Sequence, residues 1–330
     1  MGLATVDLVH RVDRIPGVDE KAQATGVEVA AGGPATNAAV TAAALGAEVT
    51  LVTAVGAHPL GSLIRADLAA HGVELIDAAP DDPAPPPVSA ITVLASTGQR
   101  TIVSRNAGDM LVELPSLPTA DLTLVDGHHP KLAVAAARSA RRLLVDAGSW
   151  RPVFPDIFPH AWAVAASAAF RHPAAFRHPA AFRHPAAFRH PAAGRPADLL
   201  APTSRTAPTS LFADRSDLSE RDAALAAAIG TPIVIVTHGP EPVSWFHGGQ
   251  SGTIPVPPVP AIDTAGAGDA FHGALAVALT QHFPPDKPDK PYKSGLSGVA
   301  TRLRPALEAA IRVAGVRVTH AGPRSWLAAL

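Results

Sequence analysis

The chain has 330 residues, of which 47% are hydrophobic and 17% charged, with a formal net charge of −1 at pH 7 and no cysteine. This length and hydrophobic content suit one large α/β domain or two small ones. The near-zero charge offers no basic field for nucleic acid, and the absence of cysteine excludes disulfides and thiolate metal sites. Because no signal-peptide pattern and no long apolar run occur, we expect a cytoplasmic protein without a membrane or nucleic-acid partner.

Short apolar segments alternate with helical patterns along most of the chain. Strand patterns fall at residues 49–56, 121–127, 142–148, 162–167 and 232–239, and helical patterns at 38–45, 63–70, 131–142 and 305–313. This alternation predicts an α/β fold with a parallel sheet covered by helices on both faces. In such sheets ligands bind at the carboxyl ends of the strands, where Asp126 and Asp146 end two of the predicted strands.

The most informative segment is residues 261–279. Gly266 and Gly268 allow the backbone from Ala265 to Asp269 to curl with several N–H groups pointing inward. Apolar residues then recur three or four apart, which predicts an amphipathic helix whose N-terminus favours an anion. Asp269 beside a bound phosphate makes chemical sense as a base that deprotonates an attacking hydroxyl. The alternative is that Asp269 only caps the helix.

Two segments resemble the signatures of the ribokinase (PfkB) family of carbohydrate kinases. The C-terminal signature is matched by DTAGAGDAF at 263–271, and the N-terminal one by AAGGPATNAAVTAAALGA at 30–47. The resemblance implies a single domain over 1–330 with a ribokinase-like three-layer α/β/α fold, a mainly parallel central sheet and a small β lid from segments near 8–30 and 88–109. It also implies transfer of the γ-phosphoryl group of ATP to a hydroxyl, usually a primary alcohol, of a small-molecule sugar.

The lid segment 88–109 also has a pattern of its own. Two runs rich in β-branched residues are joined by Ser-Thr-Gly-Gln, which predicts a β-hairpin. By resemblance this hairpin covers the sugar, excludes water from the transferred phosphoryl group and mediates a homodimer. The alternative is an edge hairpin without ligand contact.

The resemblance assigns catalytic and substrate roles to individual residues. Asp269 would be the general base. The backbone around it would form the anion hole at Ala265, Gly266, Ala267 and Gly268. The sugar-binding positions would be Asp7, Gly32, Gly33 and Asn37, with further contacts from Arg105 and Asn106 at the end of the hairpin. Asp7 and Asn37 could alternatively cap a turn and a helix.

The nucleotide and its cations have fewer candidates. Thr237 and Gly239 resemble a strand-end motif that contacts ATP, together with the backbone of Ala265, Gly266 and Gly268, although Pro242 stands where the pattern has another glycine. Mg²⁺ would be held mainly by phosphate oxygens and water, so no protein ligand is assigned. A monovalent cation is a further cofactor that the resemblance implies, with Asp263 near it. The family's Asn and Glu pair is not recognisable around 201–210.

Three segments depart from the family pattern. Met1 directly precedes Gly2 where the family has a full strand, so either the central sheet lacks part of its first strand or the start lies upstream. AAFRHP occurs four times in tandem over 168–191, and its regular prolines forbid a continuous helix. We interpret the extra copies as a tolerated loop expansion, with metal binding by the four histidines as the alternative. Residues 282–304 predict a flexible insertion.

Three functions stay open at this point. The leading hypothesis is a sugar kinase, with the two signatures closest to the branch that contains ketose and sulfosugar kinases. The second is a nucleoside kinase of the same family, which would need apolar or aromatic residues around the base. The third is a catalytically impaired protein that binds a sugar or nucleotide.

Overall fold

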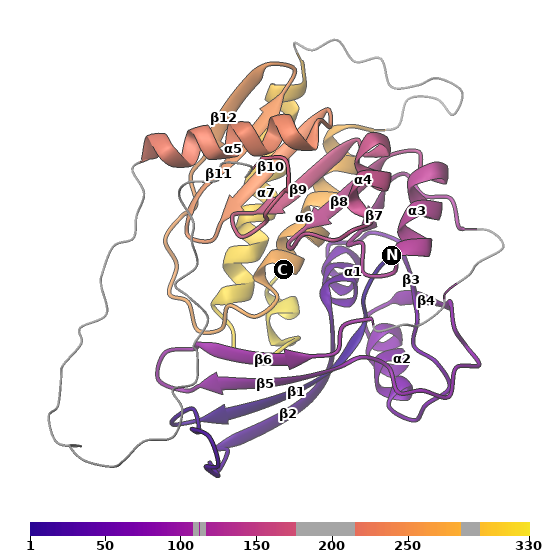
Figure 1. The fold of residues 1–330 in the computed structure, drawn as a ribbon, viewed down its shortest axis with the longest axis vertical. Coiled ribbons are helices and arrows are strands. Elements are labelled where there is room, and N and C mark those ends of the chain that lie inside the picture. The colour runs from indigo at the N-terminus through magenta and orange to yellow at the C-terminus, as the bar shows by residue number, and fades with distance from the viewer. Residues whose placement is uncertain (108–111, 113–116, 176–214, 285–297) are drawn as a thin grey trace, which may run out of the picture.

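A computed structural model describes residues 1–107, 112, 117–175, 215–284 and 298–330 (Figure 1). Its elements in chain order are β1 Thr5–Val12, β2 Gly26–Gly32, α1 Pro34–Ala44, β3 Val49–Thr53, α2 Gly61–Ala70, β4 Val73–Asp77, β5 Val88–Leu94, β6 Arg100–Ser104, β7 Thr123–Val125, α3 Pro130–Ser139, β8 Leu143–Ala147, α4 Phe154–Ile157, the 3₁₀ turn Phe158–His160, β9 Ala163–Ser167, α5 Arg215–Ile229, β10 Ile233–His238, β11 Glu241–His247, β12 Gln250–Ile254, α6 Ala267–His282, α7 Val299–Val318 and the 3₁₀ turn Ser325–Ala329.

A six-stranded sheet forms the middle of the molecule (Figure 1). Its order is β12-β11-β10-β9-β8-β7, with β7 to β10 parallel and β11 and β12 antiparallel at one edge. Successive residues of β10 face opposite sides, so Ile233 and Ile235 pack with α6 and α7, whereas Val234 and Val236 pack with α3, α4 and α5. The three-layer α/β/α fold with a mainly parallel central sheet is therefore confirmed.

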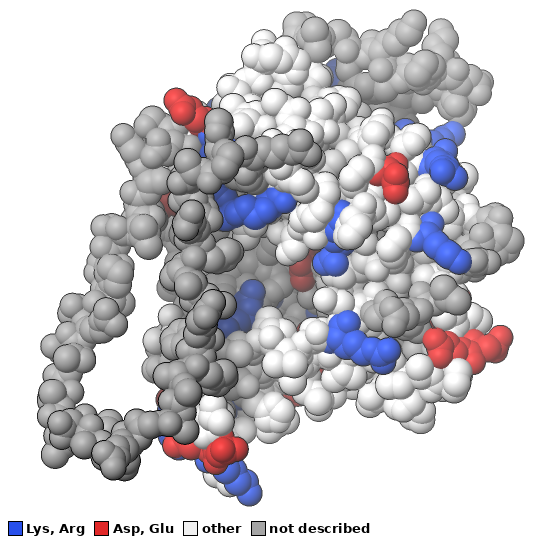
Figure 2. Space-filling model, viewed as in Figure 1, with Lys and Arg blue, Asp and Glu red and all other residues white. Residues whose placement is uncertain are grey.

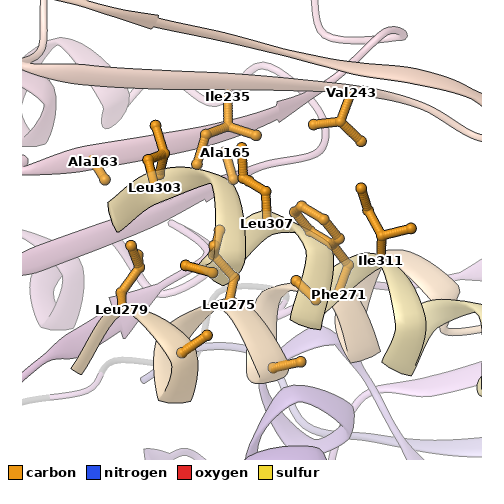
Figure 3. Close-up of a cluster of buried hydrophobic side chains, with 14 of the residues drawn as sticks. Ala163, Ala165, Ile235, Val243, Phe271, Leu275, Leu279, Leu303, Leu307 and Ile311 are labelled. Carbon is orange, nitrogen blue, oxygen red and sulfur yellow. The ribbon is translucent and has the colours of Figure 1, made fainter. Parts of the chain in front are cut away.

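Helices α6 and α7 cover one face of this sheet. Figure 3 shows their apolar side chains pointing toward each other and toward the strands. The apolar stripe predicted on α6 is at most 4% exposed at every position, namely Phe271, Ala274, Leu275, Ala278 and Leu279. Each large side chain contributes about 1.5–3 kcal/mol by burial, so this stripe fixes α6 on the sheet.

The start of α7 differs from the sequence expectation. We expected an insertion over 282–304 and a helix from Pro305, but α7 begins at Val299 and contains that proline within it. Val299 and Leu303 are buried in the cluster with α6, and this packing offsets the cost of a helical proline. Residues 285–297 lie outside the described residues.

Strands β3 and β4 form a separate parallel pair beside the six-stranded sheet. Met1 lies between the two sheets, where its amino group donates to the Leu124 carbonyl at 2.7 Å and the Gly2 N–H donates to the Val52 carbonyl at 3.3 Å. A cavity of about 580 Å³ continues from Met1 between β3 and β7 under α1 and α6. Within the described ranges no strand pairs with both β3 and β7, so the two sheets stay separate at this point.

A four-stranded sheet of order β2-β1-β5-β6 projects from the layered part (Figure 1). Its strands lie in the two segments expected to form a lid, and β5 and β6 form the expected hairpin. Asp7 pairs with Ser89, which pairs with Ser104, so these three residues form a row on one face. Arg100 lies on the same face by alternation and donates to the Thr264 hydroxyl at 3.3 Å. The face of the sheet that carries Asp7 is therefore directed toward the C-terminal signature.

The first copy of the AAFRHP repeat contributes to the core. Phe170 is fully buried, and its ring lies 5.7 Å from that of Phe154 and 5.9 Å from that of Trp150. From residue 176 onward the later copies, with three of the four repeat histidines, lie outside the described residues, as do residues 201–210.

The described surface has two further features. On the face seen in Figure 2, Lys and Arg side chains are scattered rather than gathered into one basic patch. In the ranges that the structure describes, no helix is both long and apolar enough to cross a bilayer.

Gly273 sets how closely α1 approaches α6. A Cβ atom at this position would lie 2.3 Å from the Ala38 carbonyl oxygen and 2.9 Å from the Thr41 Cβ. We predict that Gly273→Ala lowers the free energy of unfolding by about 1–3 kcal/mol, because the two helices must separate. The matched control is Gly315→Ala in α7, where the nearest atom lies 4.0 Å away and the change should add about 0.5–1 kcal/mol through helix propensity. Urea unfolding of both variants measures the difference, and equal effects would contradict the packing argument.

Candidate active site

The C-terminal signature folds into a loop that ends at the start of α6. Gly266 is the N-cap residue with φ 71°, in the left-handed region that favours glycine. Within the described residues, no acceptor is found for the N–H groups of Gly266, Gly268 and Asp269. Such N–H groups at a helix N-terminus form an anion site.

Two of the four predicted anion-hole positions have other partners in this structure. The Ala265 N–H donates to Asp263 Oδ1 at 2.9 Å, and the Ala267 N–H makes a long bond of 3.4 Å to the Thr264 carbonyl. These two bonds give the loop its shape, so the predicted donors left for a ligand are Gly266 and Gly268 rather than Ala265 and Ala267.

Asp269 lies at the third position of α6, partly exposed. Its Oδ2 accepts a hydrogen bond of 2.8 Å from Asn37 Nδ2, across 232 residues of sequence. The helix has no side-chain cap, so the interpretation of Asp269 as a cap is wrong. The second carboxylate oxygen is left to act on a ligand.

Asn37 is held in one orientation by a residue that sequence reasoning missed. Arg324 Nη1 donates to Asn37 Oδ1 at 3.0 Å, which turns the Nδ2 group of Asn37 toward Asp269. Arg324 is itself fixed by Asp67, to which Nη2 donates at 2.8 Å and Nε at 3.1 Å. Asn37 keeps one N–H and one lone pair for a ligand, so its predicted sugar role is compatible with this network.

Asp7 faces the same region from β1. Its carboxylate accepts a bond of 2.6 Å from the Thr5 hydroxyl and a further bond from Ser89. Burial raises the pKa of Asp7 above its ordinary value, and the charge of Asp269 adds to this rise, although both hydroxyl groups oppose it. Two carboxylates therefore lie close enough to affect each other, a pattern typical of functional sites.

Gly32 and Gly33 of the N-terminal signature stand where neighbouring atoms leave no room for a side chain. A Cβ on Gly32 would lie 2.0 Å from Asp7 Oδ2, and one on Gly33, whose φ is +91°, would lie 2.5 Å from the Leu3 carbonyl oxygen. The pair therefore leaves the room in which the Asp7 carboxylate sits.

Arg105 and Asn106 follow Ser104 at the end of β6 and are exposed. The Asn106 N–H donates to the Ser104 hydroxyl, whose oxygen lies 3.2 Å from the Ser89 hydroxyl oxygen beside Asp7. This places both residues at the rim of the Asp7 face, and their contact with a sugar stays a prediction.

Thr237 and Gly239 lie at the carboxyl end of β10. Thr237 pairs with Ser167 of β9, and Gly239 forms the following turn with φ +65° and no atom within 4 Å of a Cβ position. His272, one turn beyond Asp269 in α6, contacts the Ala165 carbonyl of β9 at 3.3 Å. The start of α6 and the two predicted nucleotide positions therefore share one edge of the sheet, as ligand sites in such folds do.

Asp126 directly follows β7 and Asp146 is the penultimate residue of β8, so both lie at strand ends as predicted, but both have structural partners. Asp126 accepts from the N–H groups of Leu3 at 2.8 Å and His128 at 2.9 Å. Burial opposes ionisation of Asp126, yet His128 holds its pKa well below the usual range. Burial raises the pKa of Asp146, although the nearby His272 opposes this.

Comparison with known proteins gives the class. The chain matches the pfkB family carbohydrate kinase model over residues 1–328, so it belongs to that family and is a kinase. It is 25% identical over 295 residues to ribokinase from Bacillus subtilis (strain 168), which covers 85% of each chain.

Solved structures agree on the fold. A putative ribokinase from Agrobacterium tumefaciens superposes with a TM-score of 0.69 at 22% identity, covering 99% of this chain and 92% of the other. Arabidopsis thaliana ribokinase complexed with ribose and ATP gives a TM-score of 0.65 at 18% identity, and the match covers 99% of this chain and 96% of that chain. The resemblance inferred from the two signatures is thus confirmed.

Asp7 offers a test of the site through pH. Because its folded-state pKa is raised above the ordinary value of 3.8, the ionised carboxylate costs stability as pH rises through the raised pKa. We predict that Asp7→Asn unfolds at a higher temperature than the wild type at pH 7, that this advantage shrinks toward pH 4, and that substrate affinity falls.

The measurements are melting temperatures from about pH 4 to pH 7 and the KM for the accepted substrate. The control is Asp13→Asn at an exposed position directly after the same strand, which should change neither the melting temperature nor the KM. A variant less stable than the wild type at pH 7 would contradict the assignment.

Proposed function

We propose that this kinase transfers the γ-phosphoryl group of ATP to a hydroxyl of a sugar, with Asp269 as the general base. The observation that carries the proposal is the pairing of an oriented carboxylate with unpartnered N–H groups at one helix start. The bond from Asn37 holds one oxygen of Asp269, and Gly266 and Gly268 offer N–H donors within the three residues before Asp269.

The chemistry follows from this arrangement. The free oxygen of Asp269 accepts the proton of the sugar hydroxyl while the oxygen of that hydroxyl bonds to the γ-phosphorus. The bond from the γ-phosphorus to the oxygen that bridges it to the β-phosphorus breaks, which releases ADP. Negative charge on the transferred group is stabilised by the N–H groups of Gly266 and Gly268 and by the dipole of α6. The residues supply position and electrostatics for the transfer.

The sugar would lie between the four-stranded sheet and the start of α6. Asp7 supplies carboxylate oxygens for substrate hydroxyls, Asn37 an amide group, and the backbone at Gly32 and Gly33 leaves the space. An ionised carboxylate that is kept partly buried costs stability, which supports its retention for binding. A primary hydroxyl of a ketose or related sugar is the acceptor that we favour.

ATP would bind along the shared sheet edge, with Thr237 and Gly239 near the nucleotide and the α6 start at the phosphates. In the described ranges no group of three or more His, Asp or Glu side chains could hold a metal ion. Mg²⁺ would be bound chiefly by phosphate oxygens and water and would neutralise phosphate charge.

The outer face of the four-stranded sheet supports a homodimer through the lid. The residues Val29, Leu8, Ala90 and Val103 pair in this order across the four strands. By alternation along the strands, this row lies on the face opposite to Asp7. Val29 is 51% and Val103 72% exposed, and neighbouring apolar side chains across a sheet form a surface that a second copy can cover.

The first test is an ATP-consumption assay over sugars and nucleosides with wild type and Asp269→Asn. We predict that a sugar stimulates ATP turnover and that the substitution lowers kcat by at least about 10²-fold while ATP still binds. The control is Asp156→Asn, an exposed residue at the same position in the first turn of α4. Equal rates would exclude Asp269 as the base, stimulation by nucleosides alone would favour a nucleoside kinase, and no stimulation would favour a binding protein.

Gly268 tests the anion site separately. No atom lies within 4 Å of a Cβ added there, so Gly268→Ala should leave the melting temperature unchanged. The added methyl group would stand where the phosphoryl group approaches the N–H donors, and we expect a loss of about 10²-fold in kcat/KM for ATP. Gly315→Ala is the matched control. Full activity of Gly268→Ala would mean that the phosphates bind elsewhere.

A further inference from the structure

Arg317, in the last turn of α7, lies directly beneath the signature loop. It is 4% exposed, and a Cβ atom on Gly266 would lie 3.8 Å from its Nε. Its Nη2 donates to Asp263 Oδ2 at 3.3 Å, and its Nη1 donates to the Asp263 carbonyl at 3.4 Å and the His320 carbonyl at 3.0 Å. One guanidinium group thus joins the loop to the end of α7.

The oxygens that surround this guanidinium are of the kind that bind a hard cation. A carboxylate oxygen and two backbone carbonyl oxygens from separate segments converge on one point. The family resemblance implies a monovalent cation near Asp263. In this chain the same residue already faces two fixed positive charges, because Arg11 Nη2 also lies 3.8 Å from Asp263 Oδ2. A bound metal cation would be repelled by both, so the residues present do not fit one.

We propose that the guanidinium of Arg317 takes the place of a monovalent cation beneath the anion-binding loop, so that the kinase turns over without added K⁺ or Na⁺. The inference rests on the proposed function in one respect, namely that the loop at Gly266 and Gly268 receives the transferred phosphoryl group.

Arg317 acts as a positioning residue through Asp263. With its charge balanced, the Asp263 carboxylate accepts from the Ala265 N–H at 2.9 Å and the Gly322 N–H at 3.3 Å. The first bond shapes the loop, and the second holds the turn that leads to Arg324, which orients Asn37. A single buried cation therefore supports both the anion site and the network behind Asp269.

The chemistry of arginine suits this place better than an exchangeable ion. Burial lowers the pKa of Arg317 while Asp263 opposes the shift, and a guanidinium stays protonated at any physiological pH. Its planar donors can reach the Asp263 carboxylate and two carbonyl groups at once. The positive charge stays in place when the ionic composition of the medium changes, and it adds to the field that attracts phosphate.

The test compares wild type, Arg317→Met and Arg317→Lys in choline chloride replaced stepwise by KCl at constant ionic strength. We expect wild-type turnover to change less than twofold across the series. Arg317→Met should lose about 10²-fold in kcat/KM, with part of the loss restored by K⁺ or by guanidinium chloride at low concentration, and Arg317→Lys should retain more activity. The exposed Arg312→Met on the same helix is the control and should match the wild type.

A measurement of melting temperature, which does not depend on turnover, separates this proposal from the proposed function. A cation that binds the folded protein raises its melting temperature in proportion to occupancy. We expect no K⁺-specific rise for the wild type and a rise for Arg317→Met, whichever substrate is used. Activation of the wild type tenfold or more by K⁺, or a K⁺-specific rise in its melting temperature, would overturn the proposal. If Arg317→Met does not fold, these two wild-type measurements still decide the question.

Discussion

The close crossing of α1 and α6 at Gly273 is the contact on which the candidate site depends. The absence of a side chain there lets the Ala38 carbonyl approach α6 closely. Asn37 directly precedes Ala38 in α1, and Asp269 lies one turn before Gly273 in α6. A hydrogen bond of 2.8 Å from Asn37 to Asp269 joins the two helices beside this crossing. The two signatures, far apart in sequence, are thus joined by packing before any ligand binds.

The segment after α7 completes the site from the other side. Arg317 and Arg324 lie seven residues apart, and each links elements that are distant in sequence: the first joins the loop at Asp263 to the end of α7, and the second joins Asn37 to Asp67 on α2. Both are buried or nearly so and bonded to carboxylates, which makes each costly to remove. A site with several carboxylates needs such fixed cations to bind an anionic donor.

Local sequence pattern was sufficient for the central parallel strands β7 to β10 and for the residues in contiguous motifs. Alternating apolar segments predicted the parallel sheet, and the spacing of glycine and aspartate predicted both the start of α6 and the place of Asp269 in its first turn. Arg324 could not be found in this way, because its partner Asp67 is 257 residues away and neither stands in a recognisable motif. The start of α7 was missed for a similar reason, since tertiary packing of Val299 outweighs the local signal of Pro305.

Asp7 shows why the site has a cost that the rest of the fold must offset. The carboxylate is partly buried against the sheet, its pKa is raised, and the hydroxyl groups of Thr5 and Ser89 satisfy it only in part. A hydrophobic residue would stabilise the sheet more, yet Gly32 is kept free of a side chain to make room for this carboxylate. The burial of the large apolar clusters on both faces of the six-stranded sheet offsets the loss of folding free energy that such a polar site causes.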